Sequence, residues 1–418
     1  SQISKLTARW RTDYGKFGWS VAINKDGTTA IVGAPDCRAN NIHDGGVAFI
    51  FTKNGRNWEP QEELYVFDWT DHKLGKSVAI NEDGTIVVVG AYEQNTHNKW
   101  DSGAAYIFER SRNGTWGTIS KEITHEEANA ENTGWAYLGY SVAISGTTIF
   151  VGQPGATGNS TTYAGVVEIW DKDDSGNWIK IQQIRSSDGE KGDYFGASVA
   201  ISGNTAIVGA YKEGLSDDVD EAGAAYIFTK NHLSIWNETQ KLTASDREAN
   251  DRFGWSVAIN GDTAIVGAKW EDISSSDEYA GAAYIFTKDG DTWSETQKLT
   301  ASDREAGDMF GASVAISGTT AIVGAYGDNK IRSSVEIDNG APSDNLAGAA
   351  YIFVRNSDES WPEYPTYKLT ASERGVVDWF GWSVAISGAT VIIGAFAQGA
   401  TGEYLDSNNL PTDGYGAA

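Results

Sequence analysis

The sequence predicts an all-β protein, a seven-bladed β-propeller of four-stranded antiparallel blades. One phrase, which reads FGWSVAINGDTAIVGAK from Phe253, returns seven times along the 418 residues. Each copy contains four short stretches rich in β-branched and apolar residues, separated by turn residues. A repeat of this length with four strand signals is typical of a propeller blade.

A Phe-Gly or Leu-Gly pair aligns the copies, and successive pairs are separated by 57, 64, 57, 58, 57 and 70 residues. No amphipathic helical stretch of useful length is present. The rungs of a β-solenoid, the rival fold, are much shorter than this period. We therefore expect one propeller over residues 1–418, with repeats that start near Phe17, Leu74, Leu138, Phe195, Phe253, Phe310 and Phe380.

Each of the four stretches has its own pattern. The first, FGWSVAI, leads into a pair such as Asp26-Gly27 or Gly203-Asn204, which favours a tight hairpin. The second, TAIVGA, is a continuous apolar run that fits a strand buried on both faces. The third is GAAYIF, and the fourth, ETQKLTAS, alternates as an outer strand would. A tryptophan expected to pack between blades follows the third stretch at Trp58, Trp116, Trp178, Trp236, Trp293 and Trp361.

The two ends of the sequence predict how the ring closes. The segment SKLTA at residues 4–8 looks like a fourth strand, because Leu6 stands before Phe17 as Leu242 stands before Phe253. The sequence ends in GYGAA, a stub of the third stretch. We expect residues 3–8 to complete the last blade and to hide its edges. If the native chain stops at Ala418, a slot for a neighbour's strand remains, and the alternative is that the chain continues.

The repeated residues resemble a known family. FG followed by VGAP is similar to the FG-GAP repeat, the blade unit of the integrin α-chain propeller. The sequence is closer still to a calcium-free microbial variant of that repeat, with the pattern KLTASD…FGxSVAISGxTAIVGA, and the likeness covers nearly the whole chain. The resemblance implies a propeller in an extracellular setting. The hairpins after the first stretch, such as NKDGTT and SGTT, have too few carboxylates for calcium.

Composition and motifs exclude several classes of function. The net charge of −25 opposes nucleic-acid binding, and no apolar run is long enough for membrane insertion. No phosphate-binding loop, zinc cluster or nucleophile elbow is present. The five histidines have no metal-ligand spacing, and we interpret them and Cys37 as loop residues. The histidines are His43, His72, His97, His125 and His232. The sequence therefore predicts a protein without enzymatic activity and without a cofactor.

Candidate binding residues lie in the connections between the second and third stretches, where the copies differ most. Trp100 with Asp101, and Trp270 with Glu271, pair an aromatic ring with a carboxylate, which suits sugar binding. Two acidic clusters suit a divalent cation, although solvated acidic loops would have the same composition. The clusters are Asp217, Asp218, Asp220 and Glu221, and then Glu271, Asp272, Asp277 and Glu278.

Two further sets of polar residues recur. An aspartate stands two residues before the Phe-Gly pair at Asp193, Asp251, Asp308 and Asp378, where we expect it to bind turn amides. Sequons permit glycosylation at Asn113, Asn159 and Asn237.

These observations favour an extracellular or cell-surface scaffold that acts in adhesion through protein contacts or self-association, including assembly into a fibre. A carbohydrate-binding propeller is the alternative, and an enzyme with a site on the loops is the least favoured hypothesis.

Overall fold

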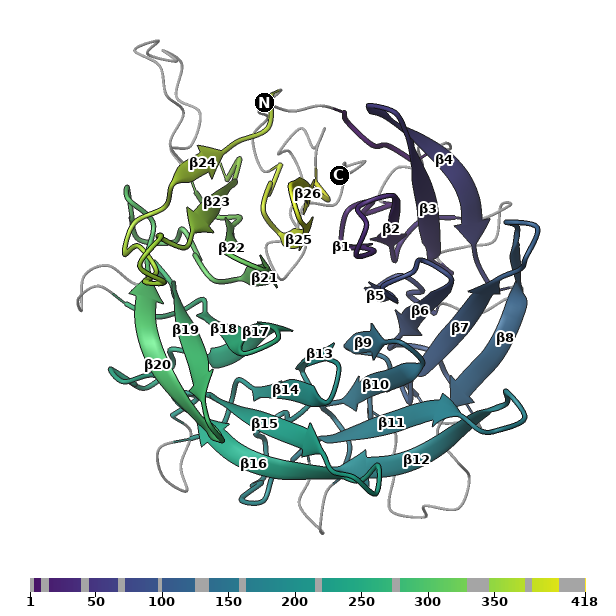
Figure 1. The fold of residues 1–418 in the computed structure, drawn as a ribbon, viewed down its shortest axis with the longest axis horizontal. Coiled ribbons are helices and arrows are strands. Elements are labelled where there is room, and N and C mark those ends of the chain that lie inside the picture. Colours follow the sequence, from purple (N-terminus) through teal and green to yellow (C-terminus); the bar gives the residue numbers. More distant parts are fainter. Residues whose placement is uncertain are drawn as a thin grey trace.

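The computed structural model describes residues 4–8, 15–38, 45–66, 72–96, 100–124, 135–157, 163–214, 220–272, 279–328, 346–372, 378–397 and 418. Its strands form separate antiparallel sheets that stand around a central axis, as the blades of a propeller do (Figure 1). In each sheet the strands follow the order of the sequence from the axis outward. The fold class is therefore confirmed as an all-β propeller.

Four positions are distinguished across a blade. The innermost strands are β1 (Ser20–Ile23), β5 (Ser77–Ile80), β9 (Val142–Ser145), β13 (Ser198–Ser202), β17 (Phe253–Asn260), β21 (Ser313–Ser317) and β25 (Ser383–Ser387). The second strands are β2 (Thr29–Ala34), β6 (Ile86–Ala91), β10 (Thr148–Gln153), β14 (Thr205–Ala210), β18 (Thr263–Ala268), β22 (Thr320–Ala325) and β26 (Thr390–Gly394). The third strands are β3 (Val47–Asn54), β7 (Ala104–Arg110), β11 (Val166–Lys172), β15 (Ala224–Lys230), β19 (Ala282–Asp289) and β23 (Ala349–Val354). The outer strands are β4 (Asn57–Leu64), β8 (Trp116–Thr124), β12 (Trp178–Ile184), β16 (Trp236–Leu242), β20 (Thr292–Leu299) and β24 (Tyr367–Leu369).

The number of complete blades differs from the prediction of seven. Six sheets have four strands, whereas the last repeat contributes the two-stranded sheet β25–β26. The stub GYGAA lies outside the described residues except for Ala418. Leu6 and Ala418 nevertheless exchange two backbone hydrogen bonds, of 2.8 and 3.3 Å, although residues 4–8 are not assigned as a strand.

One serine in each innermost strand, or directly before it, links neighbouring sheets. In every repeat, the hydroxyl of this serine donates to the carbonyl of the glycine in the next Phe-Gly or Leu-Gly pair, at 2.7 to 2.8 Å. The bond from Ser383 to Gly18 joins the last repeat to the first. The series comprises Ser20 to Gly75, Ser77 to Gly139, Ser141 to Gly196, Ser198 to Gly254, Ser256 to Gly311, Ser313 to Gly381 and Ser383 to Gly18.

The core lies between successive sheets. The second strands β2, β6 and β18 are buried along their whole length, as the continuous apolar run predicts. The aromatic ring of the Phe-Gly pair fills the gap to the third strand, because Phe195 is fully buried with Tyr226 and Phe228 at centroid distances of 5.6 and 5.9 Å. Such edge-to-face pairs add stability beyond the buried area.

Five of the six tryptophans that follow the third strands lie on outer strands, and Trp361 lies between β23 and β24. Trp116, Trp178, Trp236, Trp293 and Trp361 are buried, whereas Trp58 is half-buried. Backbone groups of Trp236 also bind the side chain of Gln182 on the neighbouring outer strand, at 2.7 and 2.9 Å. Burial and these bonds hold the outer strands together.

The sheet β25–β26 is less well covered than the others. Val391 and Ile393 of β26 are only half-buried, although the equivalent residues of β2 are fully buried.

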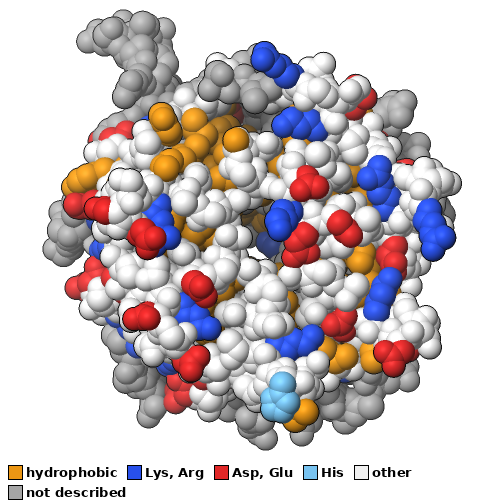
Figure 2. Space-filling view, viewed as in Figure 1, with side chains coloured by type: hydrophobic (Ala, Val, Ile, Leu, Met, Phe, Trp, Pro, Cys, Tyr) orange, Lys and Arg blue, Asp and Glu red, His pale blue; other side chains and the backbone are white. Residues whose placement is uncertain are grey.

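On the face shown in Figure 2, hydrophobic side chains gather over β23 and β24 and near β26, while acidic and basic side chains surround a hollow centre.

Candidate functional site

Each repeat brings one residue, at the start of its innermost strand or just before it, to the propeller axis. The residue that follows each Phe-Gly or Leu-Gly pair lines a single cavity of about 140 Å³, which we call the axial pocket. Tyr211 and Tyr326, each directly after a second strand, complete its lining. The seven residues after the pair are Trp19, Lys76, Tyr140, Ala197, Trp255, Ala312 and Trp382.

A turn before each innermost strand places these side chains at the axis. The N–H of the lining residue donates to the carbonyl three residues earlier, as Trp255 does to Arg252 at 3.1 Å. The accepting residue has a φ between 50° and 59°, which is uncommon outside glycine. Because all seven repeats share this strain, it belongs to the fold. The residues are Lys16, Lys73, Tyr137, Tyr194, Arg252, Met309 and Trp379.

Small and large residues compensate one another around the axial pocket. Ala197 and Ala312 leave space that a tryptophan fills in other repeats. In these two repeats the residue after the second strand is a tyrosine, whose ring packs on the next tryptophan: Tyr211 on Trp255 at 4.8 Å, and Tyr326 on Trp382 at 4.7 Å between centroids. The result is a nearly continuous aromatic wall.

Among the described residues that line the axial pocket, Lys76 is the one that carries a charge. Its Nζ atom lies 4.3 Å from the ring centroid of Trp19, 5.0 Å from that of Tyr92 and 5.1 Å from that of Tyr140. The faces of these rings attract the ammonium group. Burial lowers the pKa of Lys76 to about 8, and the neighbouring charge of Lys16 acts in the same direction.

A second set of cations lies among aromatic rings beside the pocket. Lys269 is 6% exposed, and its Nζ lies 3.1 Å from the ring centroid of Trp255. Burial holds the pKa of Lys269 well below its usual value. The guanidinium of Arg252 lies 3.1 Å from the centroid of Trp270. Trp270, predicted to stack on a sugar, is therefore half-buried under an arginine of the same protein.

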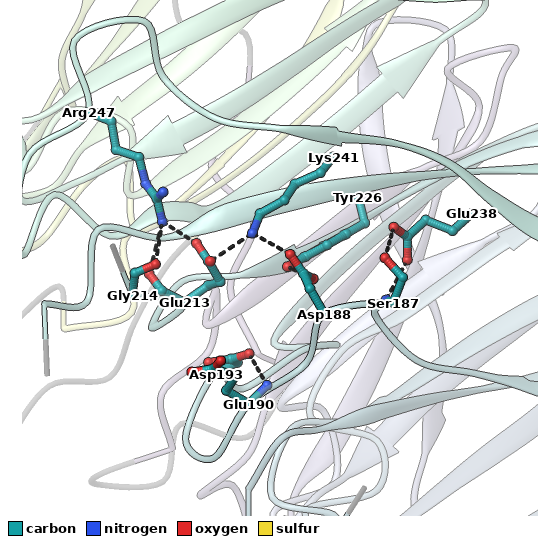
Figure 3. A network of polar contacts seen from close by, with 10 residues as sticks. All are labelled: Ser187, Asp188, Glu190, Asp193, Glu213, Gly214, Tyr226, Glu238, Lys241 and Arg247. Carbon is teal, nitrogen blue, oxygen red and sulfur yellow. Dashed lines mark hydrogen bonds and ion pairs between the residues drawn. The ribbon is translucent and has the colours of Figure 1, made fainter. Parts of the chain in front are cut away.

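Figure 3 shows a polar network that fixes the connections at the end of the blades where second strands end and innermost strands begin, which we call the loop face. Lys241 on β16 bridges Asp188 at 2.6 Å and Glu213 at 2.7 Å, and Arg247 also binds Glu213. The hydroxyl of Tyr226 donates to Asp188 at 2.8 Å. Burial opposes ionisation of Asp188, but the hydrogen bonds from Lys241 and Tyr226 hold its pKa below the usual value.

The same network recurs in the next blade and includes a predicted site residue. Glu271 is 6% exposed, and its carboxylate binds Lys298 at 2.5 Å and also Arg304. Lys298 reaches Asp246 at 2.5 Å, as Lys241 reaches Asp188 in the preceding blade. Glu271 is thus held in a repeated ion-pair network, and its sugar-binding or cation-binding role stays a prediction.

The other acidic residues of the predicted cation sites do not gather in the described part of the chain. Glu221 binds Lys212 at 3.0 Å and Arg252 at 2.5 Å. Asp272 accepts the N–H of Tyr279 at 2.7 Å, and the backbone carbonyl of Asp220 accepts the N–H of Asn250 at 2.6 Å. Asp217, Asp218, Asp277 and Glu278 lie outside the described residues. Within the described ranges, no three His, Cys, Asp or Glu side chains could hold a metal ion.

Trp100 and Asp101 lie on the loop face. Trp100 is 71% exposed, and its carbonyl accepts the N–H of Trp135, itself 48% exposed, at 2.9 Å. The N–H of Asp101 donates to Asn95 at 2.9 Å, and its carbonyl accepts the N–H of Tyr137. Both predicted residues are therefore anchored through their backbones while the ring of Trp100 faces solvent.

The repeated aspartate before the Phe-Gly pair binds a turn amide, as predicted, in three repeats. The side chains of Asp193, Asp251 and Asp308 each accept the backbone N–H of the residue three positions earlier, at 2.7 to 2.8 Å. The fourth aspartate, Asp378, is 1% exposed. Burial raises the pKa of Asp193 and Asp251 to about 6 and that of Asp308 to about 7.

These raised pKa values predict a stability that falls as pH rises. An ordinary aspartate titrates near 4, so between about pH 4 and pH 7 the folded protein holds protons that the unfolded chain has lost. We expect Asp308→Asn to match the wild type below about pH 4 and to exceed it in the free energy of unfolding near pH 8. Denaturant unfolding at both pH values measures this. Asp262→Asn, in an exposed hairpin, is the control, and equal pH dependence of Asp308→Asn and wild type would contradict the prediction.

The remaining predicted positions are scattered. Asn113 lies in a turn and Asn237 lies on the outer strand β16, and both are exposed. Asn159 lies outside the described residues. His43, His97 and His125 also lie outside them, whereas His72 and Cys37 are buried and His232 is exposed.

Sequence reasoning missed the axial pocket. The signal was present in the residue after each Phe-Gly pair, which changes from Trp to Lys, Tyr or Ala while its neighbours stay the same. In the sequence this position looks like part of a structural strand, because its place on the common axis is evident only once the ring is closed.

Comparison with known protein families finds the FG-GAP repeat, which matches residues 1–51, 69–108, 178–228, 236–286, 293–353 and 366–408. No curated protein matches the chain. Repeats of this family are typical of extracellular proteins, and the described residues include no helix long and apolar enough to cross a membrane. Because the matched segments cover well over half of the sequence and fall on the propeller sheets, the chain belongs to the FG-GAP repeat family.

Proposed function

We propose that this chain is a non-enzymatic scaffold, extracellular or displayed at a cell surface, that acts in adhesion through protein contacts of its loop face. FG-GAP propellers are typically protein-interaction modules, and the family is generally non-enzymatic. The proposal includes a seven-bladed ring in which residues 4–8 complete the last blade. It needs no cofactor, and calcium at the hairpins is not part of it.

The observation that carries the proposal is the exposed aromatic pair on the loop face. Trp100 and Trp135 expose 71% and 48% of their surfaces, although tryptophan is mostly buried in folded proteins. A backbone hydrogen bond joins the two residues, so the pair is held in place before any partner binds. Tryptophan is enriched among the residues that dominate binding energy at protein interfaces.

The alternative of a carbohydrate-binding propeller shares this surface, because an exposed tryptophan also stacks on sugars. Protein contact is favoured by the carboxylate next to Trp270. The Glu271 carboxylate is 6% exposed and is bound by Lys298 and Arg304, so it is turned toward the protein's own cations rather than toward a sugar. Self-association belongs to the same hypothesis, since a second copy is one form of protein partner.

Adhesion of protein-coated beads to the producing cells tests the proposal. We expect the double variant Trp100→Ser, Trp135→Ser to reduce bead binding about tenfold or more, because loss of an interface anchor costs about 2 kcal/mol. The matched control is Leu233→Ser, Ile235→Ser. These residues are 65% and 45% exposed in the β15–β16 turn, at the opposite end of the blade. The role of the loop face would be refuted if beads coated with the wild-type protein did not bind the cells. It would also be refuted if both double variants lost the same amount of bead binding.

A further inference from the structure

The last sheet carries an apolar surface that the other sheets cover with a third strand. Among the described residues, β26 pairs only with β25. Ala418 exchanges backbone hydrogen bonds with Leu6, and elsewhere the second alanine of the third stretch stands opposite a leucine of the fourth, as Ala350 stands opposite Leu369. Ala418 is thus in register with that alanine, the residue just before Tyr-Ile-Phe in other repeats.

In most other repeats, two aromatic side chains at alternate positions of the third strand cover this surface. Phe253, of the Phe-Gly pair, is fully buried and packs on Tyr284 and Phe286 at centroid distances of 5.5 and 5.9 Å. The third repeat has Glu168 and Trp170 at the two positions. The aromatic pairs are Phe49 and Phe51, Tyr106 and Phe108, Tyr226 and Phe228, Tyr284 and Phe286, and Tyr351 and Phe353.

The corresponding surface of the last repeat is only half-buried. We call it the β26 face, and it consists of Ile352, Phe380, Ile386, Val391 and Ile393, which pack in one cluster. Hydrophobic side chains also gather near β26 in Figure 2. An exposed apolar patch is a typical site of interaction. The counterparts one blade earlier are at most 8% exposed, and they are Ile285, Phe310, Ile316, Ala321 and Val323.

The backbone edge of β26 is open to a strand as well. In five blades, a residue at the end of the third strand donates its N–H to the carbonyl directly before the second strand, as Lys288 does to Asp262 at 2.9 Å. In the last repeat this carbonyl belongs to Ala389, and no described residue donates to it. An apolar face beside an unpaired edge is suited to the addition of a strand. The other four bonds run from Lys53 to Thr28, Arg110 to Thr85, Lys230 to Asn204 and Arg355 to Thr319.

The register of the complete blades defines the segment that fits. Tyr351 stands opposite Val323, whose equivalent in β26 is Ile393. Two positions further along, Phe353 stands opposite the residue equivalent to Val391. Because side chains alternate along a strand, an added antiparallel strand would place its first and third side chains on the β26 face.

Lys5 favours a tyrosine at the first of these positions. In three blades a lysine of the outer strand stands opposite the third-strand tyrosine, with its Nζ atom 5.2 to 5.6 Å from the ring centroid. Lys5 precedes Leu6 as Lys368 precedes Leu369, so it has the same place beside an added strand. An aromatic ring attracts such a cation. The three pairs are Lys241 over Tyr226, Lys298 over Tyr284 and Lys368 over Tyr351.

We propose that the β26 face binds an extended segment of a partner protein with the pattern Tyr-x-Phe, which enters as a third strand between β26 and residues 4–8. Main-chain hydrogen bonds supply affinity, and the two aromatic side chains supply specificity. A second copy of this chain is not the partner, because each of its described third strands is already paired on both sides. The site is separate from Trp100 and Trp135, so this binding goes beyond adhesion through the loop face.

Fluorescence anisotropy of a labelled peptide tests the proposal on the full 418-residue chain. The probe is Tyr-Ile-Phe-Thr-Lys, the sequence of residues 226–230. We expect saturable binding and a melting temperature that rises with peptide concentration. A peptide of the same composition in the order Tyr-Phe-Ile-Thr-Lys should bind at least tenfold more weakly, because its second ring points away from the β26 face. No binding of the probe, or equal binding of the two peptides, overturns the proposal.

A proline in place of the peptide's isoleucine tests the strand geometry without any change to the protein. An added strand lies between β26 and residues 4–8, so each of its N–H groups faces a neighbouring strand on one side or the other. Proline removes one of these donors, and we expect at least a tenfold loss of affinity. Unchanged binding would show that the peptide docks through its rings alone, which overturns strand addition.

The variant Ile393→Thr keeps the branched shape but makes the β26 face more polar, and we expect peptide affinity to fall at least fivefold. The control is Ile119→Thr: Ile119 is 36% exposed on β8 in the second repeat, and its loss should leave affinity unchanged. Lys5→Ala alters an exposed side chain and should lower affinity about threefold through loss of the cation–ring contact. Unchanged affinity in both Ile393→Thr and Lys5→Ala overturns the proposal.

Two further arms identify the occupant. Native protein purified from its source should bind the peptide as the 418-residue chain does. No binding would show that a segment of the chain itself covers the β26 face, which overturns the partner. Self-association that the peptide abolishes would assign the face to a second copy and would overturn the partner as well. The Trp100→Ser, Trp135→Ser variant should bind the peptide as the wild type does, so failure of adhesion and failure of peptide binding are separable results.

Discussion

Gly209→Ala is expected to lower the free energy of unfolding by about 3 kcal/mol or to prevent folding, because there is no space for a side chain at this position. A Cβ atom there would lie 2.1 Å from the carbonyl oxygen of Gly254 in the next blade and 2.3 Å from the hydroxyl of Ser198. That carbonyl accepts the hydrogen bond from Ser198 that links the two blades. The added methyl group would push the two blades apart at a close backbone contact. Denaturant unfolding measures the effect.

Gly117→Ala is the matched control for this prediction. Gly117 lies on the outer strand β8, where an added Cβ would have its nearest contact at 3.3 Å, with the carbonyl oxygen of Glu109. We expect a change within about 0.5 kcal/mol there. If Gly209→Ala were as stable as Gly117→Ala, the close approach of neighbouring blades would be disproved.

Removal of residues 1–8 is expected to destabilise the protein by about 4 kcal/mol. Two backbone hydrogen bonds with Ala418 would be lost, at about 1 kcal/mol each. Leu6 is 6% exposed and packs in one cluster with Phe17, Val32 and Ile392, so its loss adds about 2 kcal/mol. The bared edge beside β25–β26 should also promote aggregation. Thermal unfolding and light scattering measure the two effects.

The point variant Leu6→Asp isolates the contribution of the buried side chain. It should reproduce much of the loss in melting temperature, because an unpaired carboxylate would be forced into an apolar cluster. Substitution of the exposed neighbour, Lys5→Ala, serves as the comparison. An unchanged melting curve after removal of residues 1–8 would show that this segment does not close the ring.

The candidate site was only partly accessible to sequence reasoning. Repetition identified Asp193, Asp251 and Asp308 as binders of turn amides, because a residue that recurs in register has a structural task. The opposite inference, that function lies in the variable connections, located Trp100 on the loop face but overlooked the axis. Glu271 could not be recognised from sequence as an ion-pair partner of Lys298 and Arg304, since those residues follow it by some thirty positions.

The sequence by itself determined the repeat, the four strands of a blade and the propeller fold, because these depend on local periodicity, turn residues and the copying of one pattern. The tertiary structure alone decided what the ring creates. Trp19, Lys76 and Tyr140 are 57 and 64 residues apart in the chain, yet closure around the axis brings them to one cavity. The positive φ before each pair is likewise a product of packing. A pocket on the propeller axis is assembled from residues of every repeat, so no single repeat encodes it.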